Sequence, residues 1–215
     1  MTAAPVAALE EAVVLTGGFP VLAGVTLQLE PATLTVVVGA NGAGKTSLLR
    51  LLAGLDQLSR GRGVVAGVDL AHGDRRVLRR RVGWLGHEGS FYDDLSVEEN
   101  LRFAARALGR PLADVAPALT RVGLSERAAT VTRRLSAGQR RRLALAWLLV
   151  RRPEIWLLDE PYASLDSDGR ELLDGLLVDV VAAGATVVAS AHDPLRTTQA
   201  RRTLTLAGGR VVASS

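Results

Sequence analysis

A glycine-rich stretch at residues 39–47, GANGAGKTS, contains the only lysine of a chain that otherwise uses arginine for its cationic side chains. Its spacing matches G-x-x-x-x-G-K-[ST], in which backbone N–H groups hold phosphate oxygens at the start of a helix. In that pattern Lys45 reaches the β- and γ-phosphates, and the Thr46 hydroxyl is a ligand of Mg²⁺. An ammonium and a guanidinium are not interchangeable in so tight a loop. An ordinary glycine-rich turn is the alternative, but the strand pattern before the loop and the helix pattern after it favour phosphate binding.

A second motif, IWLLDE at residues 155–160, reads as an apolar strand that ends in two carboxylates. Asp159 at the strand end is expected to hold Mg²⁺ through its water shell. Glu160 is expected to polarise the attacking water as a general base. The alternative is a helix start with an acidic first turn, since Pro161 follows directly. Combined with the phosphate loop, the motif predicts hydrolysis of a nucleoside triphosphate.

A third motif, LSAGQ at residues 135–139, resembles the signature sequence of ATP-binding cassette (ABC) proteins, with alanine at a position where glycine is more usual. A serine, a glycine and N–H groups at a helix start make a second anion site. The resemblance implies that this site faces the ATP bound by the phosphate loop of a second copy. SLD at 164–166 resembles the family's D-loop, which crosses the dimer interface. His192 in ASAHD resembles the switch histidine that contacts the γ-phosphate.

The resemblance assigns each residue a role through the motif that carries it. The nucleotide contacts are Gly39, Ala40, Asn41, Gly42, Ala43, Gly44, Lys45, Thr46 and Ser47, with Phe19 added for the base. The signature residues are Ser136, Ala137, Gly138 and Gln139, and the D-loop residues are Ser164, Leu165 and Asp166. Catalysis is assigned to Lys45, Glu160 and His192, and the ligands of Mg²⁺ are Thr46 and Asp159.

Two positions depart from the family pattern. The family's glutamine at the start of the helical insertion, which touches Mg²⁺ and the attacking water, aligns with His87 when counted back from ENL at 99–101. Because Mg²⁺ prefers oxygen ligands, we expect His87 to act through a water, or Glu88 to take the oxygen role. The aromatic that stacks on adenine aligns with Thr16, and Phe19 is close by. The residue that stacks on the base is therefore left open, and so is selectivity for ATP over other nucleotides.

The elements that must position these motifs predict an α/β fold of the P-loop NTPase type. Residues 5–38 and 61–70 read as short strands, the beginning of an antiparallel β subdomain, and the later alternation of strands and helices predicts a mostly parallel sheet. Helical patterns follow Ser96, which has Glu99 at capping-box spacing, and Ser136, a candidate N-cap. We expect one ABC ATPase domain over 1–215, with a nucleotide-binding core at 1–86 and 151–215 and an inserted helical subdomain at 87–150.

Composition excludes several other classes. The 215 residues contain no cysteine, which rules out disulfides and thiolate metal sites and is typical of a reducing compartment. The net charge is +4, but the basic clusters at 75–81 and 139–143 lack interleaved aromatics, so we expect no nucleic acid partner. We also expect no signal peptide, because the N-terminus lacks a basic region followed by an apolar one, and no apolar run approaches the roughly 20 residues of a membrane span.

Within the ABC family, LGH at 85–87, LSAGQRRRLALA and WLLDEP together resemble the ATPase of the cytochrome c maturation haem exporters. The resemblance implies a homodimeric, ATP-hydrolysing motor on the cytoplasmic face of the cell membrane, docked on integral membrane subunits. Haem would be the partner's substrate, because three scattered histidines and no cysteine–proline motif make no haem site here. The alternatives are the ATPase of another small exporter, for lipids, polysaccharides or drugs, and a soluble ABC ATPase not coupled to transport.

Overall fold

The computed structural model describes residues 4–86, 91–191 and 201–215 of the chain. Its N-terminal part is an antiparallel sheet with the strand order β2-β1-β4-β5. The strands are β1 (Ala7–Thr16), β2 (Phe19–Leu29), β4 (Arg60–Val65) and β5 (Val68–Asp69). The predicted antiparallel β subdomain is therefore confirmed.

A second sheet forms the centre of the molecule, and among the described residues its order is β10-β9-β3-β8-β7-β6. The strands are β3 (Leu34–Val38), β6 (Val82–Leu85), β7 (Ile155–Leu158), β8 (Thr186–Ser190), β9 (Arg201–Ala207) and β10 (Arg210–Ser214). Only β10 runs antiparallel to its neighbour, so the prediction of a mostly parallel sheet is also confirmed.

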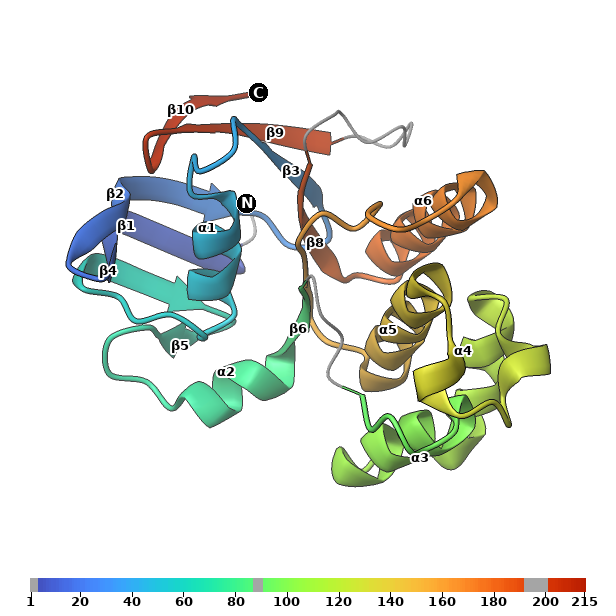
Figure 1. Ribbon diagram of the computed structural model, residues 1–215. Coiled ribbons are helices and arrows are strands. Elements are labelled where there is room, and N and C mark those ends of the chain that lie inside the picture. Colours follow the sequence, from blue (N-terminus) through green and yellow to red (C-terminus); the bar gives the residue numbers. More distant parts are fainter. Residues whose placement is uncertain (1–3, 87–90, 192–200) are drawn as a thin grey trace.

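The helices lie on both faces of the central sheet. They are α1 (Lys45–Leu52), α2 (Arg75–Arg81), α3 (Val97–Ala107), α4 (Val115–Arg121), α5 (Ala137–Arg151) and α6 (Ser167–Ala182), with short 3₁₀ turns at Leu112–Asp114, Ser125–Arg127 and Thr132–Arg134. Figure 1 shows α1 between the antiparallel sheet and the central sheet, and α3, α4 and α5 grouped on the opposite side. Within the described residues, none of these helices is long and apolar enough to cross a bilayer.

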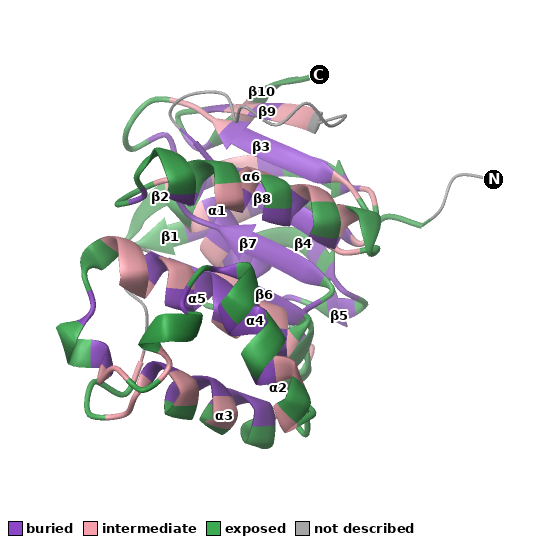
Figure 2. Cartoon of the chain, turned by 90° about the vertical axis from the view of Figure 1, so that its right-hand side faces the viewer, coloured by how far each residue is buried: buried purple, intermediate pink, exposed green. Residues whose placement is uncertain are grey.

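The central strands are buried on both faces, which is why their sequences read as continuous apolar runs. In β7, Trp156 and Leu158 pack into the core under α3–α6, whereas Ile155 and Leu157 pack into the core that contains α1 and the antiparallel sheet. Figure 2 shows β3 and β7 buried throughout most of their length. The sheet thus holds the ends of its strands, where the motifs lie, in a fixed frame between two apolar layers.

Two elements were not anticipated from the sequence, the helix α2 and the strand β6. The cluster RRVLRRR forms α2 because the Asp74 side chain accepts a hydrogen bond from the Arg76 N–H and because Leu78 is fully buried. Strand β6 is short, and its pairing with β7 defines it. Two adjacent apolar residues in a cationic cluster, of which only Leu78 is buried, are too weak a periodic signal to reveal a helix in the sequence.

Candidate functional site

The phosphate loop connects the end of β3 to the start of α1. Gly44 at the N-cap of α1 has φ 103°, and a Cβ there would lie 2.7 Å from the carbonyl oxygen of Val21. Glycine is therefore required both by the left-handed backbone and by the contact with β2. No described side chain caps this helix start, and its first turn contains no acidic residue. Within the described residues, the start of α1 is therefore left without a side-chain cap, which is the arrangement that the phosphate-loop motif predicts for anion binding.

Lys45 is 7% exposed and lies back across its own loop. Its Nζ atom donates hydrogen bonds to the carbonyl oxygens of Gly39, at 2.7 Å, and Ala40, at 3.1 Å. An ammonium held by two loop carbonyls has a third N–H that these two bonds do not use. A compact cation is thereby positioned at the mouth of the loop, where phosphate oxygens are expected.

The structure brings together the two residues predicted to hold Mg²⁺, although they are 113 positions apart. The Thr46 Oγ1 donates to Asp159 Oδ2 at 2.9 Å, and Asp159 is 1% exposed. The Thr46 hydroxyl and the Asp159 carboxylate both present hard oxygen atoms, the type of ligand that Mg²⁺ prefers. The pair therefore suits this ion. Within the described ranges no cluster of three or more His, Cys, Asp and Glu side chains forms a metal site made of protein ligands alone.

Ser190, at the end of β8, is a site residue that sequence reasoning missed. Its hydroxyl donates to Asp159 Oδ1 at 2.6 Å and accepts from the Glu160 N–H at 2.9 Å. Ser190 is fully buried, so its one side chain fixes both carboxylate residues of the motif. The available signal was a polar residue closing the apolar run ATVVAS in the strand beside β7.

The signature residues form the start of α5. The Ser136 Oγ accepts from the Gln139 N–H, and the Gln139 side chain accepts from the Ser136 N–H, so the N-cap predicted from the sequence is confirmed as a full capping box. The unusual Ala137 is exposed, and its methyl group meets no packing constraint that glycine would relieve. At Gly138 a Cβ would lie 2.9 Å from the carbonyl oxygen of Ser164, so glycine is required where the signature passes the D-loop.

Signature and D-loop residues line one hollow of about 590 Å³ on the surface. Its lining residues are Gly123, Leu124, Ser125, Glu126, Arg127, Ser136, Gly138, Gln139, Arg142, Ser164 and Asp166. Polar groups from three chain segments therefore converge on a single open site. The sequence singled out the signature and the D-loop separately but did not anticipate the segment 123–127 or Arg142.

Asp166 connects the D-loop to both neighbouring helices. Its side chain caps α6 by accepting from the Gly169 N–H at 2.9 Å, and it pairs with Arg142 of α5 at 3.0 Å. The Gly169 N–H and, second, the Arg142 side chain lower the pKa of Asp166 below its ordinary value of 3.8. The carboxylate is therefore charged at neutral pH and joins the signature helix to the D-loop.

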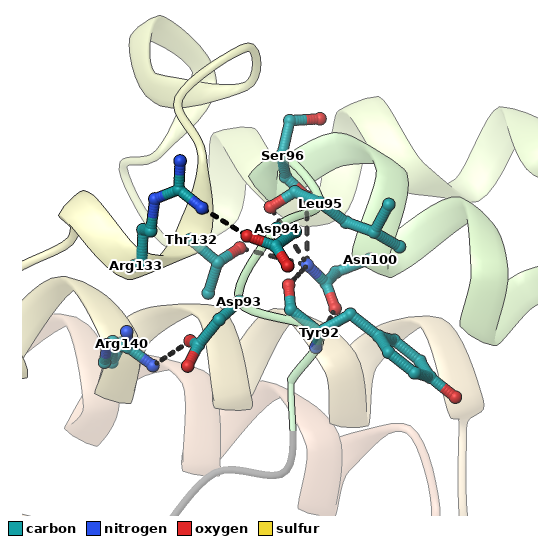
Figure 3. Close-up of polar contacts among 9 residues, drawn as sticks. All are labelled: Tyr92, Asp93, Asp94, Leu95, Ser96, Asn100, Thr132, Arg133 and Arg140. Atoms are coloured by element: carbon teal, nitrogen blue, oxygen red, sulfur yellow. Dashed lines mark hydrogen bonds and ion pairs between the residues drawn. The ribbon is translucent and has the colours of Figure 1, made fainter.

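The segment that leads into α3 is fixed by a buried asparagine, as Figure 3 shows. Asn100 Nδ2 donates to Tyr92 O at 3.0 Å and to Thr132 Oγ1 at 3.0 Å, and its Oδ1 accepts from the Tyr92 N–H at 2.9 Å. Asp93 pairs with Arg140 of α5 at 2.9 Å. Tyr92 and Asp93 are thereby attached to α3 and α5.

The two residues considered for contact with the base lie at the turn between β1 and β2. Phe19 and Thr16 are cross-strand partners at the β1–β2 turn, both exposed, and Phe19 is 77% exposed. Either side chain is accessible to a base, and the structure does not distinguish between them. His87, Glu88 and His192 lie outside the described residues.

The comparisons with known proteins agree with this fold and these motifs. The family model described as "ABC transporter" matches residues 22–163. The chain therefore belongs to the ABC transporter family and has the ATPase domain of that family.

Among curated relatives, the chain is similar to proteins named "Cytochrome c biogenesis ATP-binding export protein CcmA". It is 44% identical to the Bradyrhizobium diazoefficiens protein over 177 residues, which cover 82% of this chain and 86% of that protein. It is 42% identical to a Rhodopseudomonas palustris protein of the same name over 179 residues, which cover 83% and 88%. The similarity therefore extends well beyond the short motifs.

Two solved structures show how closely the fold is shared. An ATP-binding subunit of an ABC transporter superposes with a TM-score of 0.89 at 25% identity, covering 98% of this chain and 89% of that one. A dimeric ATP-binding cassette in a post-hydrolysis state, bound to ADP and Pi, gives a TM-score of 0.85 at 24% identity, covering 97% of each chain. The second similarity concerns the fold alone.

Proposed function

We propose that this chain is the ATP-hydrolysing subunit of a transporter that exports haem for cytochrome c biogenesis. The observation that carries this is the 42–44% identity, over more than four-fifths of the chain, to proteins named for that export. Haem is then the substrate of the membrane subunits. The chain itself would work on the cytoplasmic face of the membrane, attached through those subunits.

In the proposed mechanism the phosphate loop binds the triphosphate of ATP within one copy. Lys45 exchanges its bonds to the Gly39 and Ala40 carbonyls for bonds to the β- and γ-phosphates, so binding replaces one set of acceptors with another. Mg²⁺, held by Thr46 and Asp159, would neutralise charge on the phosphate oxygens.

Glu160 acts as the general base on the attacking water, and His192 contacts the γ-phosphate. The buried Ser190 supports this role of Glu160, because it holds the backbone N–H of the base and the carboxylate of Asp159 at the same time. A base positioned through its backbone keeps its distance to the phosphate loop while its side chain exchanges a proton.

Two copies are proposed to associate head to tail. The hollow lined by Ser136, Gly138 and Gln139 would then receive the ATP held by the other copy's phosphate loop. The Ser136 hydroxyl already accepts from the Gln139 N–H, and its own proton is left to donate to a phosphate oxygen. This supports a site that one chain cannot complete.

The segment 87–95 is proposed to transmit closure of the dimer to the membrane subunit. In support, its described part is joined to α5 through Asp93 and Arg140 and to the helices through Asn100, so it moves with the signature motif (Figure 3). Within it, the half-exposed ring of Tyr92 stacks edge to face on that of Phe103 of α3, with the ring centroids 4.9 Å apart, and the two rings offer an apolar contact.

The test is a deletion of the gene in its own organism with complementation. We expect loss of holocytochrome c while the apoprotein is still made, rescue by the wild-type chain, and no rescue by Glu160→Gln. Co-purification with an integral membrane subunit should accompany rescue. Normal cytochrome c in the deletion strain would contradict haem export and favour the ATPase of another small exporter.

A further inference from the structure

Arg141, one turn into the signature helix α5, is a buried cation that the predicted motifs do not use. It is 7% exposed, whereas its neighbours Arg140 and Arg142 make ion pairs with Asp93 and Asp166 at the surface. Among the described residues, the hydrogen-bond acceptors of Arg141 are all backbone carbonyl oxygens.

These carbonyls belong to the two strand ends that border the catalytic motif. Nη2 donates to Glu160 O at 2.6 Å and to Asp159 O at 2.7 Å, and Nε donates to Pro161 O at 3.3 Å. Nη1 donates to Gly86 O, at the end of β6. Arg141 therefore donates four hydrogen bonds from one rigid group, the guanidinium, which has five N–H donors. Only a planar guanidinium can make this pattern.

Burial of this charge is compensated by its surroundings. Burial lowers the pKa of Arg141 to about 10, and the nearby carboxylates of Asp159 and Glu160 act in the opposite direction. The side chain is consequently still protonated at neutral pH. A charged group without solvent is tolerated only where acceptors replace the water, and the four carbonyls do so.

The backbone of Glu160 needs such support. Its φ is 46°, a left-handed value that is uncommon for a residue with a side chain. Its N–H donates to Ser190 of β8, and its C=O accepts from Arg141 of α5 and from the Ala163 N–H, the latter at 3.0 Å. The bond to Ser190 ties Glu160 to the sheet, and the bond from Arg141 ties it to the helix that begins with the signature motif.

We propose that Arg141 is a positioning residue, which sets the backbone at Glu160 according to the position of the signature helix and thereby makes hydrolysis depend on that helix being in place. The proposal rests on the proposed role of Glu160 as the general base. Displacement of α5 would disturb the carbonyls of Asp159, Glu160 and Pro161 together, because one planar guanidinium, buried with its stem, donates to all three. A base displaced by about 1 Å loses on the order of 100-fold in rate.

The test uses the full chain with Arg141→Lys, which retains the charge without the planar donor set, and Arg141→Gln, which removes the charge. At saturating protein concentration we expect kcat to fall about tenfold or more in both variants, while the dissociation constant for ATP changes less than about threefold. The matched control is Arg121→Gln, which breaks an exposed ion pair with Asp179 and should retain wild-type kcat. A wild-type kcat in Arg141→Lys would overturn the proposal. Loss of ATP binding together with turnover in both variants would do the same, because it would show a purely structural role.

Combination with Glu160→Gln separates this proposal from the base assignment. If Arg141 acts through Glu160, then Arg141→Lys should lower turnover little further in the Glu160→Gln background. An equal further loss in that background would overturn the positioning role and leave the base assignment intact. Wild-type turnover in Glu160→Gln alone would contradict the base assignment and the positioning role that rests on it.

Discussion

The starts of helices α1 and α5 carry the two motifs expected to contact phosphate, yet they are built in opposite ways. No described side chain caps the start of α1, and its cation Lys45 is buried against the loop that precedes it. The start of α5 caps itself through Ser136 and Gln139 and faces an open hollow. At the start of α1, the N–H groups are left without an acceptor among the described side chains and suit an anion bound within one chain. At the start of α5, the capping box satisfies part of the N–H groups, and the remaining polar groups face the open hollow. This difference argues that only the first is a binding site by itself.

The largest expected effect is at Glu160, which follows directly on Asp159, the residue that contacts Thr46 of α1. Glu160→Gln should lower turnover by about 10²–10⁴-fold, because a general base is replaced by an amide that cannot accept the proton. ATP binding should persist, so the variant should accumulate as an ATP-bound dimer in size-exclusion chromatography. Glu171→Gln, an exposed change of the same chemistry on α6, is the control and should behave as wild type. Hydrolysis at the normal rate by Glu160→Gln would refute the assignment.

Lys45→Arg keeps the positive charge at the start of α1 but replaces a compact ammonium with a larger, planar guanidinium. The 7% exposed site holds Nζ within 3.1 Å of two carbonyl oxygens, so a branched guanidinium cannot take the same position. We expect ATP turnover to fall roughly tenfold to 100-fold. Lys45→Met, which removes the charge, should lose at least as much. Unchanged ATP affinity and turnover in Lys45→Arg would show that charge alone suffices.

The α5 side can be tested against a second helix of the same chain. Ser96 and Glu99 form a capping box at the start of α3 that matches the box at Ser136 and Gln139. Ser96→Ala and Ser136→Ala should each lower the free energy of unfolding by about 1 kcal/mol, measured by urea denaturation. Only Ser136→Ala should also lower turnover, by roughly tenfold, because it removes a hydrogen bond to a charged phosphate.

Mixing two variant chains tests directly whether the start of α1 in one copy and the start of α5 in another form a shared site. A chain with Lys45→Arg and a chain with Ser136→Ala, mixed at equal concentration, should recover part of the lost activity. The recovered site would combine an intact loop from one chain with an intact signature from the other. If the mixture were no more active than the average of its components, the two helix starts would not share a site.

The smallest expected effect concerns the Asp166 cap beside the signature hollow. The Gly169 N–H, followed by Arg142, lowers the pKa of Asp166. A carboxyl group whose pKa is lowered in the folded state stabilises the protein at pH above its ordinary pKa, and this stabilisation is lost as the pH falls through the folded-state pKa. The wild-type urea midpoint should therefore decline as pH falls below about 4, and Asp166→Asn should show a shallower decline. An identical decline in the two proteins would mean that this cap adds nothing.

The motifs of this chain were readable because each combines local chemistry with local geometry. The loop at 39–47 needs only a buried strand, glycines and a helix start, all of which leave signals within about ten residues. The capping box at Ser96 formed with Glu99 as its spacing predicts, and the predicted N-cap Ser136 formed a box with Gln139, also three positions away.

Contacts between distant segments left no such trace. Nothing near Arg141 distinguishes it from the arginines on either side, yet it is the one directed into the protein against four carbonyls. Ser190 is one serine in an apolar strand until β8 pairs with β7 and places it beside Asp159.

The sequence by itself determined the chemistry of this protein: a lysine, a threonine and two carboxylates in the order and setting of a phosphate-binding, ATP-hydrolysing site. The tertiary structure alone decided which of many similar arginines is buried and how the signature helix is tied to the backbone of Glu160. The physical reason is that a hydrogen bond to a backbone carbonyl carries no residue identity, so its partner can be known only when the chain has folded.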